Sequence, residues 1–220
     1  MLYIVSTPIG NLEDITLRAL RILKEVDLIA SEDTRHSQIL LNKYEIKTKI
    51  TSFHSYSSDE KLKQIINILE EGKSVALITD AGTPGISDPA YKLIKASIEK
   101  NIQIIPVPGA SAFLSALVVS GSHMNEFLYL GFLPLKKGRQ TLLNSLKTEK
   151  RTIILYESPH RILKTLADLE SFLGDRKIAI CRELTKKFEE IRRENISEAI
   201  LHYKTKNPKG EFVLVIYPEE

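Results

Sequence analysis

The sequence predicts an α/β protein built from two domains with mostly parallel or mixed sheets. Short apolar runs alternate with segments of helical periodicity along most of the chain, which indicates repeated strand–helix units. The pattern restarts after Ser120, so we place the domain boundary between residues 120 and 121. A chain of 220 residues can form two domains of about 100 residues each, and its 43% hydrophobic and 27% charged content is ordinary for a globular protein.

In the first domain, residues 1–120, apolar runs predict buried strands at Leu2–Ser6, Leu28–Ala30, Ile50–Phe53, Val75–Ile78 and Ile102–Val107. Helical spacing between these runs predicts helices around Ile15–Leu23, Gln38–Leu41, Leu62–Leu69 and Tyr91–Ile98. Ser57 and Glu60 have the spacing of a capping box at the start of the third helix. The amino terminus has no basic segment before its apolar residues, so we expect a first strand there and not a signal peptide.

The second domain, residues 121–220, shows the same kinds of pattern. Apolar runs predict strands at Phe127–Leu130, Thr152–Tyr156, Lys177–Cys181 and Phe212–Tyr217. Helices are predicted at Arg139–Leu146 and at the amphipathic segment Arg161–Phe172. The segment Phe188–Arg193 fits either a strand or a helix end, because its periodicity is compatible with both.

Charge is distributed unevenly over the two predicted domains. Residues 1–120 carry 13 Lys and Arg against 14 Asp and Glu, whereas residues 121–220 carry 18 against 14. Six basic residues between Lys136 and Arg151 are opposed by one acid, Glu149. A basic stripe of this kind is typical of a surface that meets phosphates, and equally of a solvated lysine-rich helix face.

Several classes of protein and of site are excluded by what the sequence lacks. No apolar stretch approaches the roughly 18–20 residues of a membrane span. The single cysteine, Cys181, excludes an internal disulfide framework and a multi-cysteine zinc site, and it suits a reducing cytoplasm. The chain has no GxGxxG after its first strand, no GxxxxGKS/T phosphate loop and no HExxH pair. We therefore expect neither P-loop nucleotide hydrolysis nor a metal site.

The segment 76–89, ALITDAGTPGISDP, carries the strongest functional pattern. A buried strand ends at Asp80 and is followed by Gly82, Pro84 and Gly85 before the next helical pattern. Glycines permit close backbone approach to a ligand, and prolines keep a loop out of regular structure. An ordinary strand-to-helix turn needs only about 2–6 residues, so we favour a ligand-binding loop over a plain turn.

Polar loops follow all five strands of the first domain and would share one edge of its sheet. They are Ser6–Asn11, Ser31–His36, His54–Ser57, Asp80–Asp88 and Pro108–Ala112. Because open parallel sheets bind ligands at the carboxyl ends of their strands, we expect these loops to form the ligand site. The loop Ser31–His36 carries four ionisable side chains, which fits a substrate role. It fits equally well a helix cap by Asp33 or Thr34, with Glu32 favoured by the helix dipole.

These segments match, in order, those of a known family. The chain resembles the tetrapyrrole methylase superfamily, the class III S-adenosylmethionine-dependent methyltransferases, and within it the small-subunit rRNA ribose 2′-O-methyltransferases. SEDTR together with DAGTPGISDP distinguishes this branch from the cobalamin- and sirohaem-pathway methylases. The matching segments span nearly the whole chain: STPIGNLEDIT (Ser6–Thr16), SEDTRHS (Ser31–Ser37), SFH (Ser52–His54), LITDAGTPGISDP (Leu77–Pro89), VPGASA (Val107–Ala112), GFLP (Gly131–Pro134), YESPHRI (Tyr156–Ile162), REL (Arg182–Leu184) and KGEFVLVI (Lys209–Ile216).

The resemblance implies two α/β domains of the tetrapyrrole methylase type, S-adenosylmethionine bound in a cleft between them, and a homodimer. It implies a cytoplasmic enzyme that methylates the ribose 2′-hydroxyl of a cytidine in 16S rRNA of the small ribosomal subunit. Carried over by position, the donor-binding residues are Pro8, Gly10, Asn11, Asp80, Gly82, Ile86, Ser87, Ser111, Ala112, Phe132, Tyr156 and Glu157. Many members continue past the last strand into a helical extension, whereas this sequence ends at Glu220.

Methylation of a ribose hydroxyl requires a positioned acceptor and help in removing its proton, because a hydroxyl is a weak acid. We predict that Glu32 or Asp33 orients the ribose and that Arg35 binds a flanking phosphate. His54 is a candidate base, although a histidine after a strand is also often a hydrogen-bonded structural residue. Further contacts with RNA are predicted at Lys136, Lys137 and Arg139.

Three other functions stay open on the sequence. A methylase with a tetrapyrrole acceptor would use the same donor site, but the basic second domain and the ionisable loop Ser31–His36 argue against it. A methyltransferase that acts on a protein is the second. The third is a non-catalytic RNA-binding module, although the basic stripe lacks the interleaved aromatic residues of a base-stacking surface.

Overall fold

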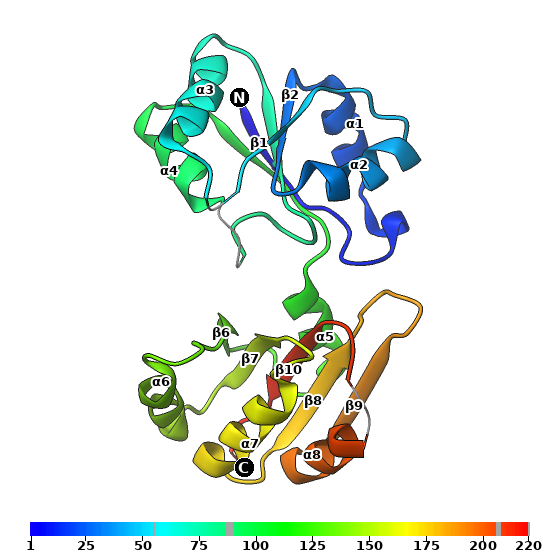
Figure 1. Ribbon diagram of the computed structural model, residues 1–220, viewed down its shortest axis with the longest axis vertical. Helices are drawn as coiled ribbons and strands as arrows, with labels where there is room; N and C mark the ends of the chain where they lie inside the picture. Colours follow the sequence, from blue (N-terminus) through cyan, green and yellow to red (C-terminus); the bar gives the residue numbers. More distant parts are fainter. Residues whose placement is uncertain (55, 87–89, 206–207, 220) are drawn as a thin grey trace. The chain divides into compact units, whose positions relative to one another are not determined.

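The computed structural model describes residues 1–54, 56–86, 90–205 and 208–219. The chain divides into two compact units, Met1–Ser111 and Ala112–Glu220, and each has its own sheet and its own hydrophobic core (Figure 1). The division lies one helix before the predicted boundary at residue 120. The reason is that α5 (Ala112–Ser120) packs on β7, β8 and β10 of the second sheet.

The first unit contains a parallel sheet in the order β3-β2-β4-β1-β5. Its strands are β1 (Leu2–Val5), β2 (Leu28–Ser31), β3 (Ile50–Ser52), β4 (Val75–Ile78) and β5 (Ile104–Val107). All five predicted strands are confirmed, with ends shifted by at most two residues. Every residue of the central strand β4 is buried, as the uninterrupted apolar run predicts for a strand covered on both faces.

Helices cover both faces of the first sheet (Figure 1). On one face α1 (Leu17–Glu25) and α2 (Thr34–Lys43) pack against Val5, Ile29 and Ile78, and the short helix η1 (Leu12–Asp14) precedes α1. On the other face α3 (Asp59–Glu70) and α4 (Tyr91–Glu99) pack against Leu2, Ala30 and Leu77. The helices that follow β1 and β2 therefore lie on one face of the sheet. The helix that follows β4, the strand between them, lies on the other face. Open sheets bind ligands at such switch points, and one lies on each side of β4.

The start of α3 differs from the predicted capping box. Ser58 is the N-cap, and its hydroxyl accepts the Lys61 N–H at 3.3 Å. Ser57 lies outside the helix, where its Oγ accepts the N–H of His54 at 2.8 Å. The prediction of a box between Ser57 and Glu60 is wrong because the neighbouring serine takes the cap position and Ser57 instead closes the turn at His54.

The second unit contains a mixed sheet in the order β6-β7-β10-β8-β9, in which only β6 and β7 are parallel. Its strands are β6 (Phe127–Phe132), β7 (Thr152–Glu157), β8 (Lys177–Arg182), β9 (Glu190–Asn195) and β10 (Phe212–Ile216). Helices α6 (Arg139–Ser145), α7 (Ile162–Leu173) and α8 (Ile196–Thr205), with the short η2 (Leu146–Thr148), build the main core of this unit with the sheet. The four predicted strands are confirmed, and the undecided segment Phe188–Arg193 enters a strand at Glu190.

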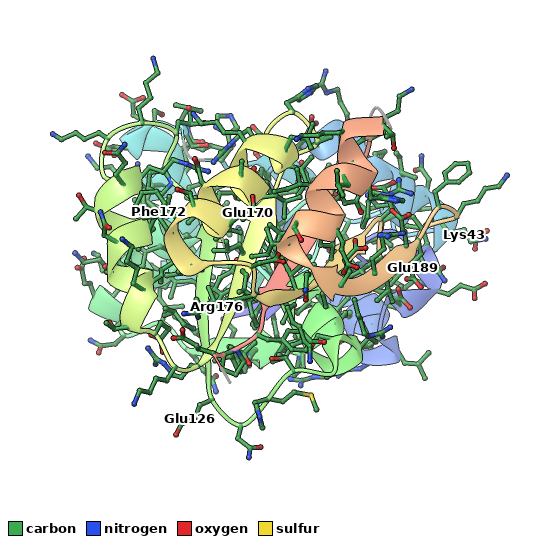
Figure 2. The ribbon with its side chains drawn as sticks, turned by 90° about the horizontal axis from the view of Figure 1, so that it is seen from below. Lys43, Glu126, Glu170, Phe172, Arg176 and Glu189 are labelled. Atoms are coloured by element: carbon green, nitrogen blue, oxygen red, sulfur yellow. The ribbon has the colours of Figure 1, made fainter. Side chains whose placement is uncertain are left out.

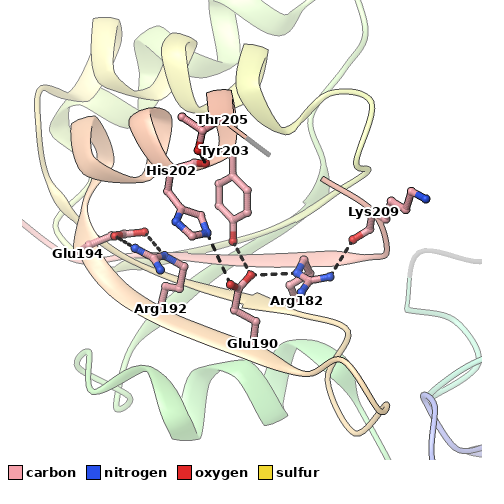
Figure 3. Close-up of polar contacts among 8 residues, drawn as sticks. All are labelled: Arg182, Glu190, Arg192, Glu194, His202, Tyr203, Thr205 and Lys209. Carbon is pink, nitrogen blue, oxygen red and sulfur yellow. Dashed lines mark hydrogen bonds and ion pairs between the residues drawn. The ribbon is translucent and has the colours of Figure 1, made fainter. Parts of the chain in front are cut away.

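A polar cluster centred on Glu190 joins β9 to α8 and β8 (Figure 3). Arg182 Nε and Tyr203 OH donate to Glu190 Oε2 at 2.9 and 3.2 Å, and His202 Nε2 lies 3.6 Å from Oε1. Burial by itself would raise the pKa of Glu190, but the hydrogen bond and the charge of Arg182 outweigh it, so this pKa lies below its ordinary value. The ionised carboxylate therefore stabilises the fold.

We expect Glu190→Gln to flatten the acid branch of the stability profile. Because the pKa of Glu190 is lower in the folded than in the unfolded chain, its stabilising contribution is complete above about pH 4.5 and is lost as the pH falls through the folded-state pKa. Urea unfolding between pH 3 and pH 7 measures this slope, with Glu170→Gln on α7 as the control substitution. A Glu190→Gln profile as steep as that of the wild type would contradict the assignment.

Candidate active site

The loops after β1, β4 and β5 are joined by hydrogen bonds at the carboxyl edge of the first sheet. Thr7 and Gly82 form an antiparallel bridge, with N···O distances of 2.9 and 3.1 Å. Thr83 Oγ1 lies 2.8 Å from Ser6 Oγ and 3.2 Å from the carbonyl oxygen of Ala110. Three loops that are far apart in the sequence therefore form one structure at the switch point between β1 and β4.

Two side-chain contacts tie the loop after β4 to the loop after β2. The N–H of Asp33 donates to Asp80 Oδ1 at 3.1 Å, and Thr79 Oγ1 donates to Glu32 Oε2 at 2.9 Å. The second carboxylate oxygen of Asp80 has no hydrogen bond to any residue that the structure describes. The loop after β4 thus connects both switch points, and Asp80 keeps one oxygen for a further donor.

Asp33 is the N-cap of α2, as one of the two interpretations of this loop predicted. Its Oδ1 accepts the Arg35 N–H at 2.8 Å, and its two oxygens pair with Arg35 Nε and Nη2 at 3.2 and 2.8 Å. The hydrogen bonds from Arg35 lower the pKa of Asp33 to about 2. A group with so low a pKa is a weak base at neutral pH, so Asp33 is unsuited to removing a proton. The Arg35 side chain is 90% exposed despite this pair.

Three buried polar atoms without a hydrogen-bond partner among the described residues lie near the carboxyl ends of β2 and β3, at the end of β2, in α2 and directly after β3. They are Ser31 Oγ, Ser37 Oγ and His54 Nδ1. Buried polar groups in folded proteins are nearly always paired, so unpaired ones call for a ligand, a water or a strained structure. Of these three side chains, the imidazole of His54 is of the type that most often serves as a general acid or base in enzymes.

The other donor-binding residues predicted in the described part of the first unit lie at this edge. Gly82 is buried and has a φ of +83°, a conformation that glycine adopts without strain. Gly109, between β5 and the segment Ala110–Ala112, approaches the β1 loop so closely that a Cβ there would lie 2.8 Å from Ser6 Cβ. Ser87 lies outside the described residues, as do Asp88 and Pro89. The remaining members are Pro8 and Ser111, which are buried, and Gly10, Asn11 and Ile86, which are exposed.

In the second unit, predicted site residues Phe132 and Tyr156 belong to an aromatic cluster on β6, β7 and α5. The ring of Tyr156 lies 5.7 Å from that of Phe132 and 5.4 Å from that of Tyr129, and Tyr129 lies 4.6 Å from Phe113. Burial raises the pKa of the Tyr156 hydroxyl above its ordinary range, which keeps the phenol neutral. Phe132 is 53% exposed, so its ring offers an apolar surface at the end of β6.

Two residues with predicted roles in the second unit have buried side chains that are paired with other residues of that unit. Arg139, predicted to contact RNA, is 6% exposed; its Nε pairs with Asp168 Oδ2 at 2.8 Å and its Nη2 donates to Thr165 Oγ1 at 2.9 Å. Glu157, predicted to bind the donor, is 2% exposed and accepts Thr165 Oγ1 at 2.6 Å, while Arg161 Nε lies 3.3 Å away. Both side chains hold α6 and α7 against the end of β7.

The basic stripe Lys136–Arg151 presents less free positive charge at the surface than its number of basic residues indicates. Besides the buried Arg139, Arg151 pairs with both oxygens of Glu149, and Lys147 Nζ lies 5.2 Å from the ring of Phe172 in the last turn of α7 (Figure 2). Lys136 and Lys137 are exposed and form no ion pair with a described residue. These two lysines are therefore the part of the predicted RNA contact that the structure leaves available.

The threonines that join the loops were not among the residues predicted for the site. Thr7, Thr79 and Thr83 each use a hydroxyl to connect neighbouring loops. Their only signal in the sequence is their position directly after an apolar run or within the Gly/Pro-rich loop. The aromatic partners Phe113 and Tyr129 were missed because each reads as an ordinary apolar residue of a helix or strand.

The residues at this edge fit a nucleoside-containing methyl donor. The switch point at β1 and β4 has a close backbone approach at Gly82, and beside it Asp80 offers an unused carboxylate oxygen to a hydroxyl or amino group. None of the helices formed by the described residues combines the length and the apolar character that a membrane crossing requires.

Comparison with known proteins identifies the family. A family model described as Tetrapyrrole (Corrin/Porphyrin) Methylases matches residues 1–200. A Thermotoga maritima protein named ribosomal RNA small subunit methyltransferase I is 50% identical over 219 residues, covering 100% of this chain and 99% of that protein. Proteins of the same name from Halalkalibacterium halodurans and Bacillus subtilis are 48% and 46% identical; each alignment covers 98% of this chain and about three quarters of the relative, 75% and 74%.

Solved structures share the fold at much lower sequence identity. A cobalt precorrin-4 methyltransferase superposes with a TM-score of 0.74 at 19% identity, covering 98% of this chain and 94% of that one. A diphthine synthase superposes with a TM-score of 0.74 at 13% identity, covering 98% and 89%. The chain thus belongs to the tetrapyrrole methylase family, whose members are methyltransferases that use S-adenosylmethionine as the methyl donor.

Proposed function

We propose that this methyltransferase acts on the ribose 2′-hydroxyl of a cytidine in 16S rRNA of the small ribosomal subunit. The observation that carries the proposal is the 50% identity, over the full length of both chains, to a protein named as a small-subunit rRNA methyltransferase. The ionisable loop Ser31–His36, tied to the donor-side loop through Asp80, supports a polar acceptor such as a nucleotide. A ribosomal RNA substrate supports a cytoplasmic location for the enzyme.

The donor is held by the loops after β1, β4 and β5 in this proposal. Bound S-adenosylmethionine supplies a methyl group on a positively charged sulfur. The chain contributes the backbone of Pro8–Asn11 and of Gly82, the carboxylate of Asp80, and Ile86, Ser87, Ser111 and Ala112. From the second unit Phe132 and Tyr156 contribute apolar ring surface, supported by the exposure of Phe132 and by the contact between the two rings.

The acceptor is oriented by Glu32 and guided by Arg35 in this proposal. Glu32 is held by the hydroxyl of Thr79, which fixes its carboxylate at the switch point between β2 and β4. The guanidinium of Arg35 is oriented by Asp33, yet the Arg35 side chain is 90% exposed. It can therefore donate hydrogen bonds to a phosphate while it stays paired with Asp33. Lys136 and Lys137 add contacts to the RNA backbone.

We expect His54→Ala to lower kcat for RNA methylation about 100-fold, while the affinity for the donor stays unchanged. His54 Nδ1 is buried and unpaired within the described part of the chain, which suits a base that meets the acceptor hydroxyl; general-base catalysis typically contributes 10²–10⁴-fold. Single-turnover rates between pH 5 and pH 9 measure this, and Ser57→Ala controls for the turn that holds His54. Wild-type rates in His54→Ala would restrict His54 to a structural role.

A homodimer completes the proposal. Leu114 and Val118 lie one helical turn apart on α5 and are 46% and 64% exposed, which gives the second unit an apolar strip of the kind that subunit contacts bury. Analytical ultracentrifugation of the wild type and of Val118→Glu tests this; a monomeric wild type would contradict the dimer.

An acceptor comparison tests the function itself. Labelled S-adenosylmethionine is incubated with the enzyme and, in parallel, with unmethylated small ribosomal subunits, naked 16S rRNA and a tetrapyrrole precursor. We expect label in the subunits. Label in the tetrapyrrole alone would replace the RNA acceptor with a small molecule and would leave the donor site intact.

A further inference from the structure

The hairpin between β8 and β9 presents an exposed aromatic ring. Phe188, in the tip Glu183–Glu189, is 65% exposed, and Lys187 Nζ lies 5.7 Å from the centre of its ring. Glu189, the last residue of the tip, marks its place in Figure 2. Lys187 forms no ion pair with any residue in the described parts of the chain. The tip therefore displays a flat apolar face beside a cation.

The backbone of this tip is held in a fixed conformation. Glu183 and Thr185 have φ values of 52° and 65°, which side chains other than glycine seldom adopt and which persist only where the surroundings hold them. Thr185 N–H donates to Glu189 Oε2 at 2.6 Å, and the side chain of Leu184 is buried in the unit. Phe188 is thus presented by a rigid loop.

A second set of contacts anchors the tip to the start of β10. Glu183 N–H donates to the carbonyl oxygen of Glu211 at 3.0 Å, and Glu183 Oε1 accepts the Glu211 N–H at the same distance. Lys186 Nζ bridges Glu183 and Glu211 at 2.9 and 2.8 Å. Lys186 is occupied by these acids, which leaves Lys187 as the cation available to a ligand.

We infer that Phe188 and Lys187 form a binding site for single-stranded RNA, in which a base stacks on the Phe188 ring and Lys187 meets an adjacent phosphate. The inference rests on the proposed function, which supplies an RNA substrate. Isolated exposed apolar residues are common, but a rigid aromatic ring next to an unpaired lysine has the two components of base-stacking sites. Every base can stack on an aromatic ring, so the site adds affinity for RNA without selecting a sequence.

The test measures binding of a short unstructured oligoribonucleotide at several salt concentrations. We expect Phe188→Ala to weaken binding about 5- to 100-fold with an unchanged salt dependence, because base stacking carries no counterion release. Phe188→Tyr should restore binding to within about twofold, and Phe188→Leu should not, because stacking requires a ring. Lys187→Ala should reduce the slope of log K against log salt by about 0.7, the value for one phosphate on a single strand.

Leu201→Ala and Lys204→Ala on α8 are the matched controls, since Leu201 is 66% exposed and both lie in the same unit. In methylation assays of the small subunit, Phe188→Ala should raise KM for the RNA and leave kcat and donor affinity unchanged. Wild-type binding in Phe188→Ala, or equal binding by Phe188→Leu and Phe188→Tyr, would overturn the inference. A lower sedimentation coefficient for Phe188→Ala would overturn it in favour of a subunit contact. Failure of the wild type itself to bind or methylate RNA would instead reject the proposed function.

Discussion

Replacing Arg139 by methionine is expected to destabilise the second unit by about 3 kcal/mol. The substitution removes the donor to the partly buried Asp168 carboxylate and a donor to the buried Thr165 hydroxyl, and breaking a buried pair from one side typically costs 3–5 kcal/mol. Partial exposure of Asp168, at 29%, places the effect at the lower end of that range. Urea unfolding followed by circular dichroism measures it.

Lys136→Met and Lys137→Met are the matched controls for Arg139→Met. These lysines are exposed, so each substitution should change the free energy of unfolding by no more than about 0.5 kcal/mol while lowering the affinity for RNA. A stable Arg139→Met protein with weakened RNA binding would contradict the structural role of Arg139 and would support a direct contact with RNA.

Asp80→Asn is expected to weaken binding of S-adenosylmethionine about 10- to 100-fold, the range for loss of a hydrogen bond to a charged group. The amide keeps an oxygen that can accept the Asp33 N–H, which Asp80 Oδ1 now accepts at 3.1 Å, so the loops stay joined. Asp80→Ala removes this acceptor as well and should lower donor affinity further and loosen the Ser31–His36 loop. Calorimetric titration measures both affinities. Donor binding by Asp80→Asn at the wild-type affinity would limit Asp80 to its contact with Asp33.

The strands of both units were predictable because a strand that is buried on one or both faces consists of a short, dense run of apolar residues. Val75–Ile78 is the clearest case, since its observed bounds equal the predicted ones. Helices α5 and α8 were not predicted. Almost every position of α5, AFLSALVVS, is apolar or small, so it has no polar face from which a helical period could be read.

The sequence predicted which loops form the candidate site better than it predicted the roles of the individual side chains. Chain order and the rule for parallel sheets place the loops after β1, β2, β4 and β5 at one edge. Roles depend on partners that are distant in the sequence: Arg139 counts as a surface charge until Asp168, 29 residues further along, is seen to neutralise it. Asp33 likewise appeared available for an acceptor before the structure paired it with Arg35 and with the first turn of α2. Charge can be counted from a sequence, whereas its desolvation and pairing require the fold.

In the proposed reaction, the 2′-hydroxyl oxygen of a cytidine ribose receives the methyl group. The most direct measurement is nucleoside mass spectrometry of 16S rRNA after small subunits lacking the modification have been incubated with the enzyme and isotopically labelled S-adenosylmethionine. We expect label in 2′-O-methylcytidine, absent when heat-inactivated enzyme is used and strongly reduced with His54→Ala. Label on a base, or label confined to protein, would contradict the claim that the ribose hydroxyl of a cytidine is the acceptor.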